Sequence, residues 1–469
     1  MKNIKFIILL VILSQSLFGQ NTYISGTIQN SKSDSIGIVL RSSLGANRTI
    51  KTKINKGVFS ITFSISQPTS AFLATSEGFL EMFVFPTDSI SATFDENDVI
   101  KTIRYQGIRA NEYNYFVKYR QNFNLPYGMF TKPDWSDIFE MNPAVFKKYR
   151  KDKVKTDLEF FNSYCIQNKV SEEFKVYAKA EIEYSYYYVL MSYPSLRYYF
   201  KKIQDTLPSD FYDDINIDLF QKHKNVVSQN YVDALKTYIY KYKIGDNKST
   251  NEFYPMAFDI AQKTYNDTSL YCFEAMLLND MFCSDIRKDI KDSIYNVFVN
   301  TCTIPLFFDF VKTSYYASKN IKNVFPNDVL TTTLITTNGD KLILKDFLSV
   351  NKGKVIYIDV WASFCGPCRI EMPYSINLHK KYIHNENVKF IYMSIDSKID
   401  AWKRAMESLK ITSDNYMIEN GLNSKLCQYL NIFGVPHYIL LNKHGEIILP
   451  SASRPSSKSA ETSIDELLK

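Results

Sequence analysis

Short alternating runs of apolar and polar residues fill the first hundred positions of the chain and predict β-strands. One run, residues 50–54, leads into the turn Asn55-Lys56-Gly57, and apolar residues alternate with polar ones again beyond it. A second turn is expected at residues 86–88, between the runs EMFVF and SISATF. The pattern therefore predicts two hairpins within a β-rich domain over residues 20–105, in which no catalytic constellation is visible.

From about Asn111 the apolar residues recur every three or four positions, which is the period of an α-helix. Two stripes of this kind predict core faces: Val154, Leu158, Phe161 and Cys165, then Val170, Phe174, Ala178 and Ile182. In the run YSYYYVLMSYPSLRYYF we expect Pro194 to break the helix. Its tyrosines are expected in the core, with a tyrosine-lined ligand groove as the alternative. An α-helical region is therefore predicted over residues 106–321.

The last third of the chain alternates strand and helix patterns. The run TTLITTNGDKLILKDFL predicts a hairpin turned at Asn338-Gly339, and KVIYIDV reads as a central strand. The other expected elements are a helix from Pro367, the strand VKFIYMSID, helices near 400–410 and 424–430, the strands YILLN and EIILP, and a last helix from about Ser459. This alternation predicts an α/β domain over residues 322–469. The expected fold class is thus multidomain: β-rich, then α-helical, then α/β.

The N-terminus has the composition of a secretory signal. Lys2 and Lys5 precede an apolar run over residues 6–13, and small or polar residues follow to Gln20. A signal peptide is predicted over residues 1–19, with cleavage near Gly19 and a retained membrane anchor as the alternative, although the apolar run is short for a span. Export places the protein in the periplasm or cell envelope, where disulfides persist.

Composition adds two constraints. The chain of 469 residues is 45% hydrophobic and 22% charged, which is typical of globular domains. Its formal net charge of +7 comes from basic residues scattered along the sequence, so no nucleic-acid partner is expected.

The number of cysteines is odd, seven in all, and therefore leaves at least one thiol unpaired. Cys272 and Cys283 lie eleven apart and, on one continuous helix, are too distant to bond each other. Cys302 with either of them, or reduced cysteines in the core, are the two alternatives left open.

The stretch DVWASFCGPCRIEMP carries the candidate chemistry. Cys365 follows a strand and opens a helix, where unpaired N–H groups and the helix dipole stabilise a thiolate, so it is the expected nucleophile. Cys368 lies one turn deeper and is expected to resolve the mixed disulfide. Pro367 suits the first helical turn. A zinc site would need a second ligand pair, which is missing nearby, so no metal is expected. A chance pair of core sulfurs fits this context poorly.

Release of the partner requires Cys368 to lose a proton in a buried place. Asp359 interrupts an apolar strand and is the first candidate base, because burial raises the pKa of a carboxyl. A structural or solvated Asp359 is the alternative. Glu371, three residues after Cys368, is the rival proton carrier.

These residues resemble a known family. The run WASFCGPCR is similar to the thioredoxin active site, and WASFCGPCRIEMP is more narrowly similar to exported TlpA-like thiol–disulfide oxidoreductases. The features that recur there in order are present here, in the last third of the chain only: Trp361-Ala362, Cys365, Cys368, Glu371, Pro373 and Val435-Pro436. The resemblance implies a redox-active disulfide between Cys365 and Cys368, and a cis Pro436 beside it. It also implies a substrate-binding surface formed by Trp361, Gly366, Pro367, Val435 and Pro436, with the Val435 backbone pairing with substrate.

Two positions depart from the thioredoxin pattern. Phe364 stands where tryptophan is usual, and His437 follows the proline where threonine is common. We expect His437 to be a packing residue, with tuning of the thiolate as the alternative. The related peroxidases require a threonine or serine at Ala362 and a proline at Ile358, so peroxide reduction is not favoured.

The expected function is a secreted or periplasmic enzyme that reduces protein disulfides and is itself recharged by a membrane thiol electron donor. The resemblance implies no cofactor and no metal. The alternative is a binding or scaffold protein of the cell envelope, whose N-terminal domains recognise a partner while the cysteine pair is secondary.

Overall fold

The fold is that of a computed structural model, which describes residues 20–42, 44, 47–125, 140–245, 248–282, 284, 286–321, 323–411, 414–432 and 434–469. The chain divides into two compact units. The first comprises Met1–Asp246 with Ala261–Phe273, and the second comprises Asn247–Ile260 with Glu274–Lys469. The predicted signal peptide, Lys322 at the predicted domain boundary and Cys283 lie outside the described residues. The bounds of the four predicted segments stay predictions.

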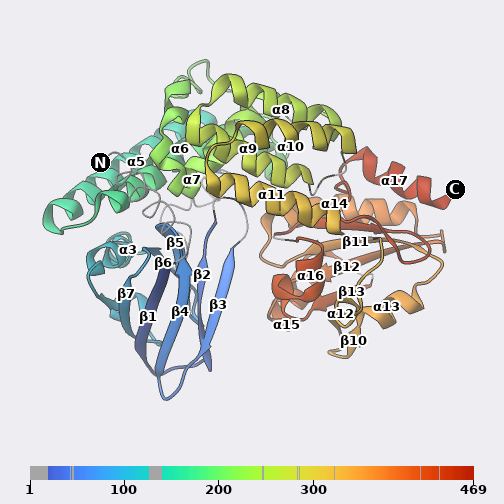
Figure 1. Cartoon of the computed structure of the whole chain (residues 1–469), viewed down its shortest axis with the longest axis horizontal. Coiled ribbons are helices and arrows are strands. Elements are labelled where there is room, and N and C mark those ends of the chain that lie inside the picture. The colour runs from blue at the N-terminus through green and yellow to red at the C-terminus, as the bar shows by residue number, and fades with distance from the viewer. Residues whose placement is uncertain are drawn as a thin grey trace, which may run out of the picture. The chain divides into compact units, whose positions relative to one another are not determined.

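The first unit begins with a β-sandwich of two four-stranded sheets, ordered β4-β1-β7-β8 and β3-β2-β5-β6 (Figure 1). Its strands are β1 (Gln20–Gln29), β2 (Ser35–Leu40), β3 (Arg48–Lys53), β4 (Val58–Ile65), β5 (Thr69–Ala74), β6 (Phe79–Val84), β7 (Ser89–Asp95) and β8 (Arg104–Gln106). Alternate side chains such as Ile24, Ile38 and Phe59 are buried in one core between the sheets. The predicted β-rich region is confirmed.

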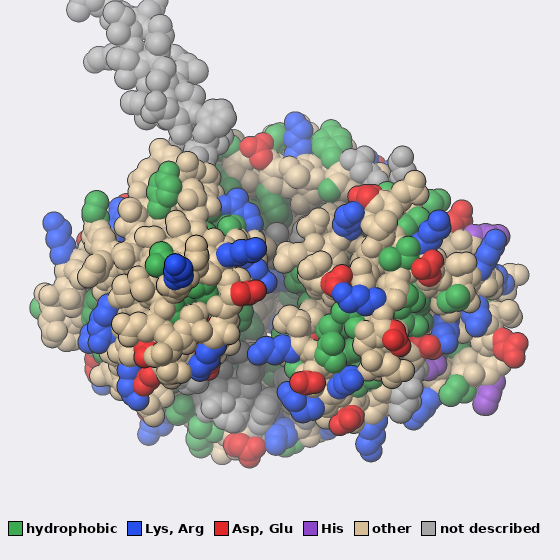
Figure 2. Space-filling model, turned by 90° about the horizontal axis from the view of Figure 1, so that it is seen from below, with side chains coloured by type: hydrophobic (Ala, Val, Ile, Leu, Met, Phe, Trp, Pro, Cys, Tyr) green, Lys and Arg blue, Asp and Glu red, His purple; other side chains and the backbone are tan. Residues whose placement is uncertain are grey.

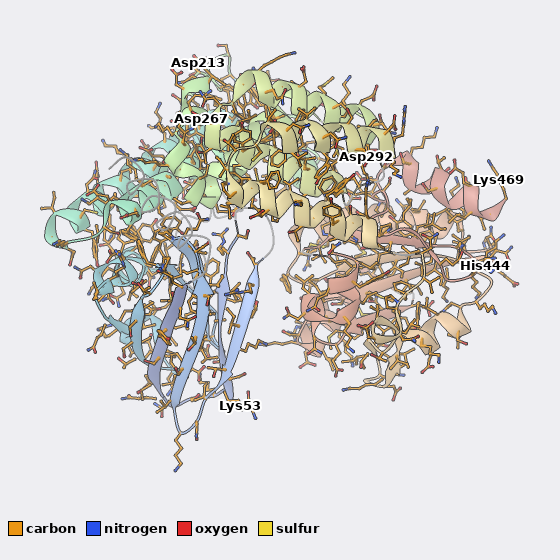
Figure 3. All side chains as sticks on the ribbon, in the orientation of Figure 1. Lys53, Asp213, Asp267, Asp292, His444 and Lys469 are labelled. Atoms are coloured by element: carbon orange, nitrogen blue, oxygen red, sulfur yellow. A yellow bond between two sulfur atoms is a disulfide. The ribbon has the colours of Figure 1, made fainter. Side chains whose placement is uncertain are left out.

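Both predicted hairpins of this region are wrong in their pairing. The turn at Lys56-Gly57 forms, with Asn55 bridged to Val58, but β3 pairs with β2 while β4 pairs with β1 in the other sheet. Figure 3 labels Lys53, the last residue of β3, near this end of the sandwich. The turn at Thr87 likewise connects β6 to β7, which belong to different sheets. Alternation alone does not show whether a turn pairs its strands or carries the chain across the core.

Helices follow the sandwich, as predicted. They are α2 (Val99–Thr102), α3 (Ala110–Phe123), α5 (Pro143–Gln167), α6 (Glu172–Lys201), η1 (Ile217–Gln221), η2 (His223–Val227), α7 (Gln229–Thr237), the π-helix η3 (Tyr238–Ile244), α8 (Thr250–Thr264), α9 (Asp267–Phe282), α10 (Lys288–Thr301) and α11 (Pro305–Asn320). The predicted stripes on α5 and α6 face the core: Phe161, Phe174 and Ala178 are buried in one cluster. Of the tyrosine run, Tyr184, Tyr186 and Tyr193 are buried in the core as expected, whereas Tyr198 is 55% exposed.

The predicted break at Pro194 does not occur, because α6 runs through it to Lys201. A proline costs the helix one hydrogen bond, and packing beside it can offset that loss. The neighbouring Tyr193 supplies such packing: its ring stacks on Phe146 at a centroid distance of 4.4 Å, and its hydroxyl donates to Met141 O at 2.7 Å.

The second unit contains a seven-stranded mixed sheet ordered β10-β9-β13-β12-β11-β14-β15, which is the predicted α/β domain (Figure 1). Its elements are α12 (Asn327–Leu330), β9 (Thr333–Thr336), β10 (Lys341–Ile343), α13 (Leu344–Val350), β11 (Val355–Trp361), α14 (Gly366–Lys381), β12 (Val388–Ser394), α15 (Ile399–Leu409), β13 (Asn415–Ile418), η4 (Gly421–Asn423), α16 (Lys425–Tyr429), β14 (His437–Leu441), β15 (Ile447–Leu449) and α17 (Lys458–Leu468).

Strand β11 lies inside this sheet, and both of its faces are covered. Tyr357 packs in a cluster with residues of α14 and α17, whereas Ile356 and Ile358 belong to a cluster that includes Trp402 of α15. This explains why β11 reads as a continuous apolar run, broken in sequence only by Asp359.

Two elements of this domain differ from prediction. The hairpin at Gly339 forms, but its second strand stops at Ile343 and the remainder of the expected strand is the helix α13. Strand β13 was not predicted; it pairs with β12 and β9 although it has only four residues. Both segments are short, and so carry little periodicity.

The structure tests the suggested disulfide in the helical region. Cys272 and Cys302 are both unpaired, so the suggested bond between them is wrong.

Basic and acidic side chains are interspersed over the described part of the face in Figure 2. Within the described residues, no helix has the length and apolar character needed to cross a membrane.

Candidate active site

The two cysteines of the CGPC run are positioned by the junction of β11 and α14. The strand ends at Trp361, and Cys365 is the N-cap of the helix. Its sulfur accepts a hydrogen bond from the backbone N–H of Cys368 at 3.0 Å, and Pro367 occupies the first turn. The N–H groups of this turn thus face the Cys365 sulfur, where they favour negative charge.

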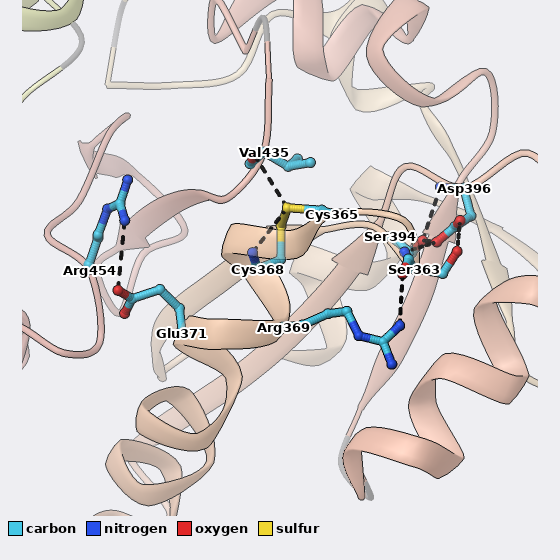
Figure 4. Close-up of a disulfide and its surroundings, with 9 residues drawn as sticks. All are labelled: Ser363, Cys365, Cys368, Arg369, Glu371, Ser394, Asp396, Val435 and Arg454. Atoms are coloured by element: carbon cyan, nitrogen blue, oxygen red, sulfur yellow. Dashed lines mark hydrogen bonds and ion pairs between the residues drawn. A yellow bond between two sulfur atoms is a disulfide. The ribbon is translucent and has the colours of Figure 1, made fainter. Parts of the chain in front are cut away.

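Cys365 and Cys368 form a disulfide, with Cα atoms 5.2 Å apart (Figure 4). Cys365 is 6% exposed and Cys368 is 1% exposed. Cys365 is therefore the sulfur that a partner reaches more easily, and Val435 O lies 3.4 Å from it. The neighbouring Phe364 is 74% exposed and places an aromatic ring at the surface beside the disulfide.

Asp359 lies on β11 beneath α14, opposite Tyr392 and Tyr438 of the adjacent strands. It is 2% exposed and accepts a hydrogen bond from Ser375 Oγ of α14 at 2.8 Å. Burial, opposed by that hydrogen bond and reinforced by the nearby charge of Glu371, raises the pKa of Asp359 to about 7. A carboxyl with this pKa can exchange a proton at neutral pH, as the sequence interpretation required.

Glu371 lies one turn after Cys368 and is 4% exposed, slightly more than Asp359. It accepts hydrogen bonds from Ser456 N at 3.2 Å and Ser456 Oγ at 2.9 Å. Arg454 lies 3.7 Å from the same carboxylate. The segment between β15 and α17 therefore fixes Glu371, a contact that sequence reasoning missed because eighty residues separate the partners.

The residues expected to bind substrate differ in whether a partner can reach them. Gly366, Val435 and Pro436 are half-buried and Pro367 is exposed, so these four can meet a partner, and the Val435–Pro436 bond is cis as the resemblance implied. Trp361 is fully buried and supports the loop from within the core. The nearby His437 packs against the protein: its Nε2–H donates to Pro450 O at 2.7 Å, and burial lowers its pKa.

A second network missed by sequence reasoning holds the loop before Cys365. Asp396, at the end of β12 and 4% exposed, accepts hydrogen bonds from Ser363 N at 2.8 Å, Ser363 Oγ at 2.6 Å and Ser394 Oγ at 2.6 Å. Arg369 of α14 donates to Ser363 O at 3.1 Å (Figure 4). A polar residue ending each of two adjacent parallel strands was the available signal.

Within the described ranges, no group of three or more His, Cys, Asp and Glu side chains is arranged to hold an ion. Asp359 and Glu371 are instead held by hydrogen bonds from protein groups.

Comparison with known proteins assigns this domain to a family. A family described as thioredoxin-like matches residues 353–447. A thioredoxin from Coprinus comatus is 37% identical over 73 residues, which are 15% of this chain and 68% of that protein. Through these residues the chain belongs to the thioredoxin-like family.

Relatives of the thioredoxin-like domain include a thiol-disulfide oxidoreductase ResA from Bacillus thuringiensis, 28% identical over 123 residues, or 26% of this chain. The chain spans 64% of the length of that relative. A solved thiol-disulfide oxidoreductase from Bacteroides fragilis is 25% identical, covers 29% of this chain and 96% of its own, and has a TM-score of 0.26.

Proposed function

We propose that the protein is a thiol–disulfide oxidoreductase that reduces disulfides of other proteins through Cys365 and Cys368. The observation that carries this proposal is the disulfide at the start of α14, with the Cys365 sulfur at the helix N-terminus and more exposed than Cys368. The ResA relatives, which are named for this activity, support it.

The proposed reaction begins with both cysteines reduced. The Cys365 thiolate attacks one sulfur of the partner disulfide, forming a mixed disulfide and releasing the other partner sulfur as a thiolate that takes up a proton. The Cys368 thiolate then attacks the Cys365 sulfur, which restores the Cys365–Cys368 disulfide and releases the second partner thiol. The partner gains two electrons and two protons, and the enzyme loses both.

The second attack needs a proton acceptor, because Cys368 is only 1% exposed. Asp359 fits this role, since its pKa of about 7 lets it accept a proton at neutral pH. Glu371 lies one turn from Cys368 and interacts electrostatically with Asp359. We assign Asp359 as the acceptor and Glu371 as a second carboxyl that adjusts its proton affinity.

The proposal also covers whether the enzyme reduces or oxidises its partner and in which compartment it acts. The Gly-Pro pair between the cysteines resembles reducing members of the family, so we assign a reductase that a dithiol on a membrane protein recharges with two electrons. Residues 1–19, interpreted as a signal peptide, place it in the periplasm or cell envelope. Its relatives favour this function over an envelope scaffold.

The test uses two cysteine variants and a disulfide-containing protein such as insulin. Cys365→Ser is expected to abolish reduction, because the attacking sulfur is lost. Cys368→Ser is expected to accumulate a mixed disulfide between Cys365 and the substrate, seen by mass spectrometry without reductant. Cys302→Ser, which replaces an unpaired, half-buried cysteine, is the control and should retain activity. Full activity of Cys365→Ser would contradict the proposal.

A further inference from the structure

Near the disulfide, three carboxyl groups are buried and two arginines are exposed. The three nearby carboxyls, Asp359, Glu371 and Asp396, are 2%, 4% and 4% exposed. Arg369 and Arg454, drawn in Figure 4 with Glu371 and Asp396, are exposed and lie on opposite sides of the disulfide. One comes from α14 and the other from the segment between β15 and α17. A partner approaching Cys365 can therefore meet these two cations, while the three carboxyls are buried.

The hydrogen bonds of Arg369 at this surface go to uncharged groups. Its guanidinium donates to Ser363 O at 3.1 Å and to Ser408 Oγ at 3.3 Å, which are neutral acceptors. Among the described residues, no carboxylate lies within ion-pair distance of it. A guanidinium has five N–H donors, so donors remain for an external carboxylate.

Arg454 is anchored but open. It lies 3.7 Å from the buried Glu371 carboxylate, yet its side chain is 59% exposed. Glu371 also accepts two hydrogen bonds from Ser456, so the arginine is not its only stabilising contact. Arg454 is thus held in place from inside while its remaining donors face solvent.

We propose that Arg369 and Arg454 form a docking surface for a polypeptide partner that carries aspartate or glutamate beside its reacting cysteine. The inference rests on the proposed function and specifies its substrate class. Attack by Cys365 requires the partner sulfur to reach it beside Val435. An extended chain advances about 3.3 Å per residue, so side chains one or two positions from that sulfur lie within reach of long arginines. Opposite charges there favour encounter and orientation.

The experiment measures reduction of two peptides by the reduced full-length protein. Each has one cysteine capped as a disulfide with a small neutral thiol, flanked on both sides by aspartates in one peptide and by lysines in the other. Each rate is divided by the rate with dithiothreitol, which removes the intrinsic reactivity of the peptide. We expect the aspartate peptide to react about fivefold faster at low ionic strength, with the ratio approaching one near 1 M salt.

Variants test whether the two arginines cause the preference for the aspartate peptide. Arg369→Gln and Arg454→Gln should each lower the ratio, and the double variant should abolish it. Arg369→Lys should retain it, because charge rather than the bond to Ser363 matters. Lys352→Gln is the matched control: Lys352 is exposed and precedes β11, whereas Cys365 follows the opposite end of that strand.

Two results would overturn the inference while leaving the proposed function intact. They are equal normalised rates for both peptides at low salt, and a preference that survives in the double variant. Failure of the protein to reduce either peptide would instead contradict the proposed function, and the docking inference with it.

Discussion

Asp359 is a buried carboxyl whose burial opposes stability and fits its proposed role as proton acceptor. It is a carboxyl on an otherwise apolar central strand, 2% exposed, with Ser375 Oγ as its hydrogen-bond donor. Burial raises its pKa from 3.8 to about 7, so folding favours its protonated form. The strand would be more stable with an uncharged residue there, and this is the kind of local conflict expected at a functional position.

The Asp359→Asn variant tests both consequences. In the folded protein the carboxyl binds a proton up to about pH 7, but in the unfolded chain only up to about pH 4. Stability of the native protein should therefore fall as pH rises through this window. The variant should lose that dependence and be more stable at pH 8, by about 4 kcal/mol, measured by urea unfolding.

The same variant should slow partner release. In the native protein the rate of mixed-disulfide resolution should rise with pH through about 7, as Asp359 becomes able to accept a proton. Asp359→Asn should remove that rise, measured by stopped-flow kinetics. Asp340→Asn, at an exposed carboxyl, is the control. Unchanged pH dependence in Asp359→Asn would exclude it as the acceptor.

At the scale of elements, the loop between β11 and α14 is tied to the end of β12. The link is Asp396, a buried carboxylate that accepts three hydrogen bonds from Ser363 and Ser394. Because Cys365 follows Ser363 by two residues, the link helps to fix the position of the Cys365 sulfur.

Asp396→Asn should weaken that anchor. An amide cannot accept three hydrogen bonds with the strength of a carboxylate, so we expect a loss of about 1 to 3 kcal/mol in unfolding free energy and slower disulfide exchange. Denaturant unfolding and the peptide assay measure the two effects. Asp400→Asn, at an exposed position nearby, is the control. An unfolding free energy of Asp396→Asn equal to that of the native protein would show that these hydrogen bonds do not contribute to stability.

Elements with a clear period could be predicted from the sequence, and the others could not. The strand β11 and the helices α14, α15 and α17 were predicted because their apolar pattern is long or sharply bounded. The four-residue strand β13 was missed, because tertiary pairing with two neighbours defines it. Packing beside Pro194 likewise overrode the local preference of proline.

The candidate site divides in the same way. The two cysteines and Asp359 could be found because each is an unusual residue in its local pattern, a carboxyl inside a strand or a thiol pair opening a helix. Arg454, Ser456 and Asp396 could not, since they reach the site only through folding. Long-range contacts of this kind leave no periodic signal in one sequence.

For the whole molecule, the thioredoxin-like domain has cores of its own. The buried residues of one cluster span Phe325 to Ile447 and those of the other span Val355 to Ile464, and the partly buried Ile321 packs on the first from outside the fragment 322–469. The fragment 322–469 should therefore unfold cooperatively, measured by circular dichroism, and keep its cysteine chemistry. Loss of partner choice, but not of exchange with small disulfides, is expected if the remaining chain recognises partners. A fragment that fails to fold would contradict its autonomy.

The central claim, that Cys365 and Cys368 are a working redox pair, is tested most directly by their reduction potential. The full protein is equilibrated in dithiothreitol or glutathione buffers and its free thiols are trapped and counted. We predict a two-electron transition near the reduction potential of thioredoxin, about −270 mV, which would support a reductase. A value near about −120 mV would reverse the direction, and a pair that never interconverts would contradict the redox function itself.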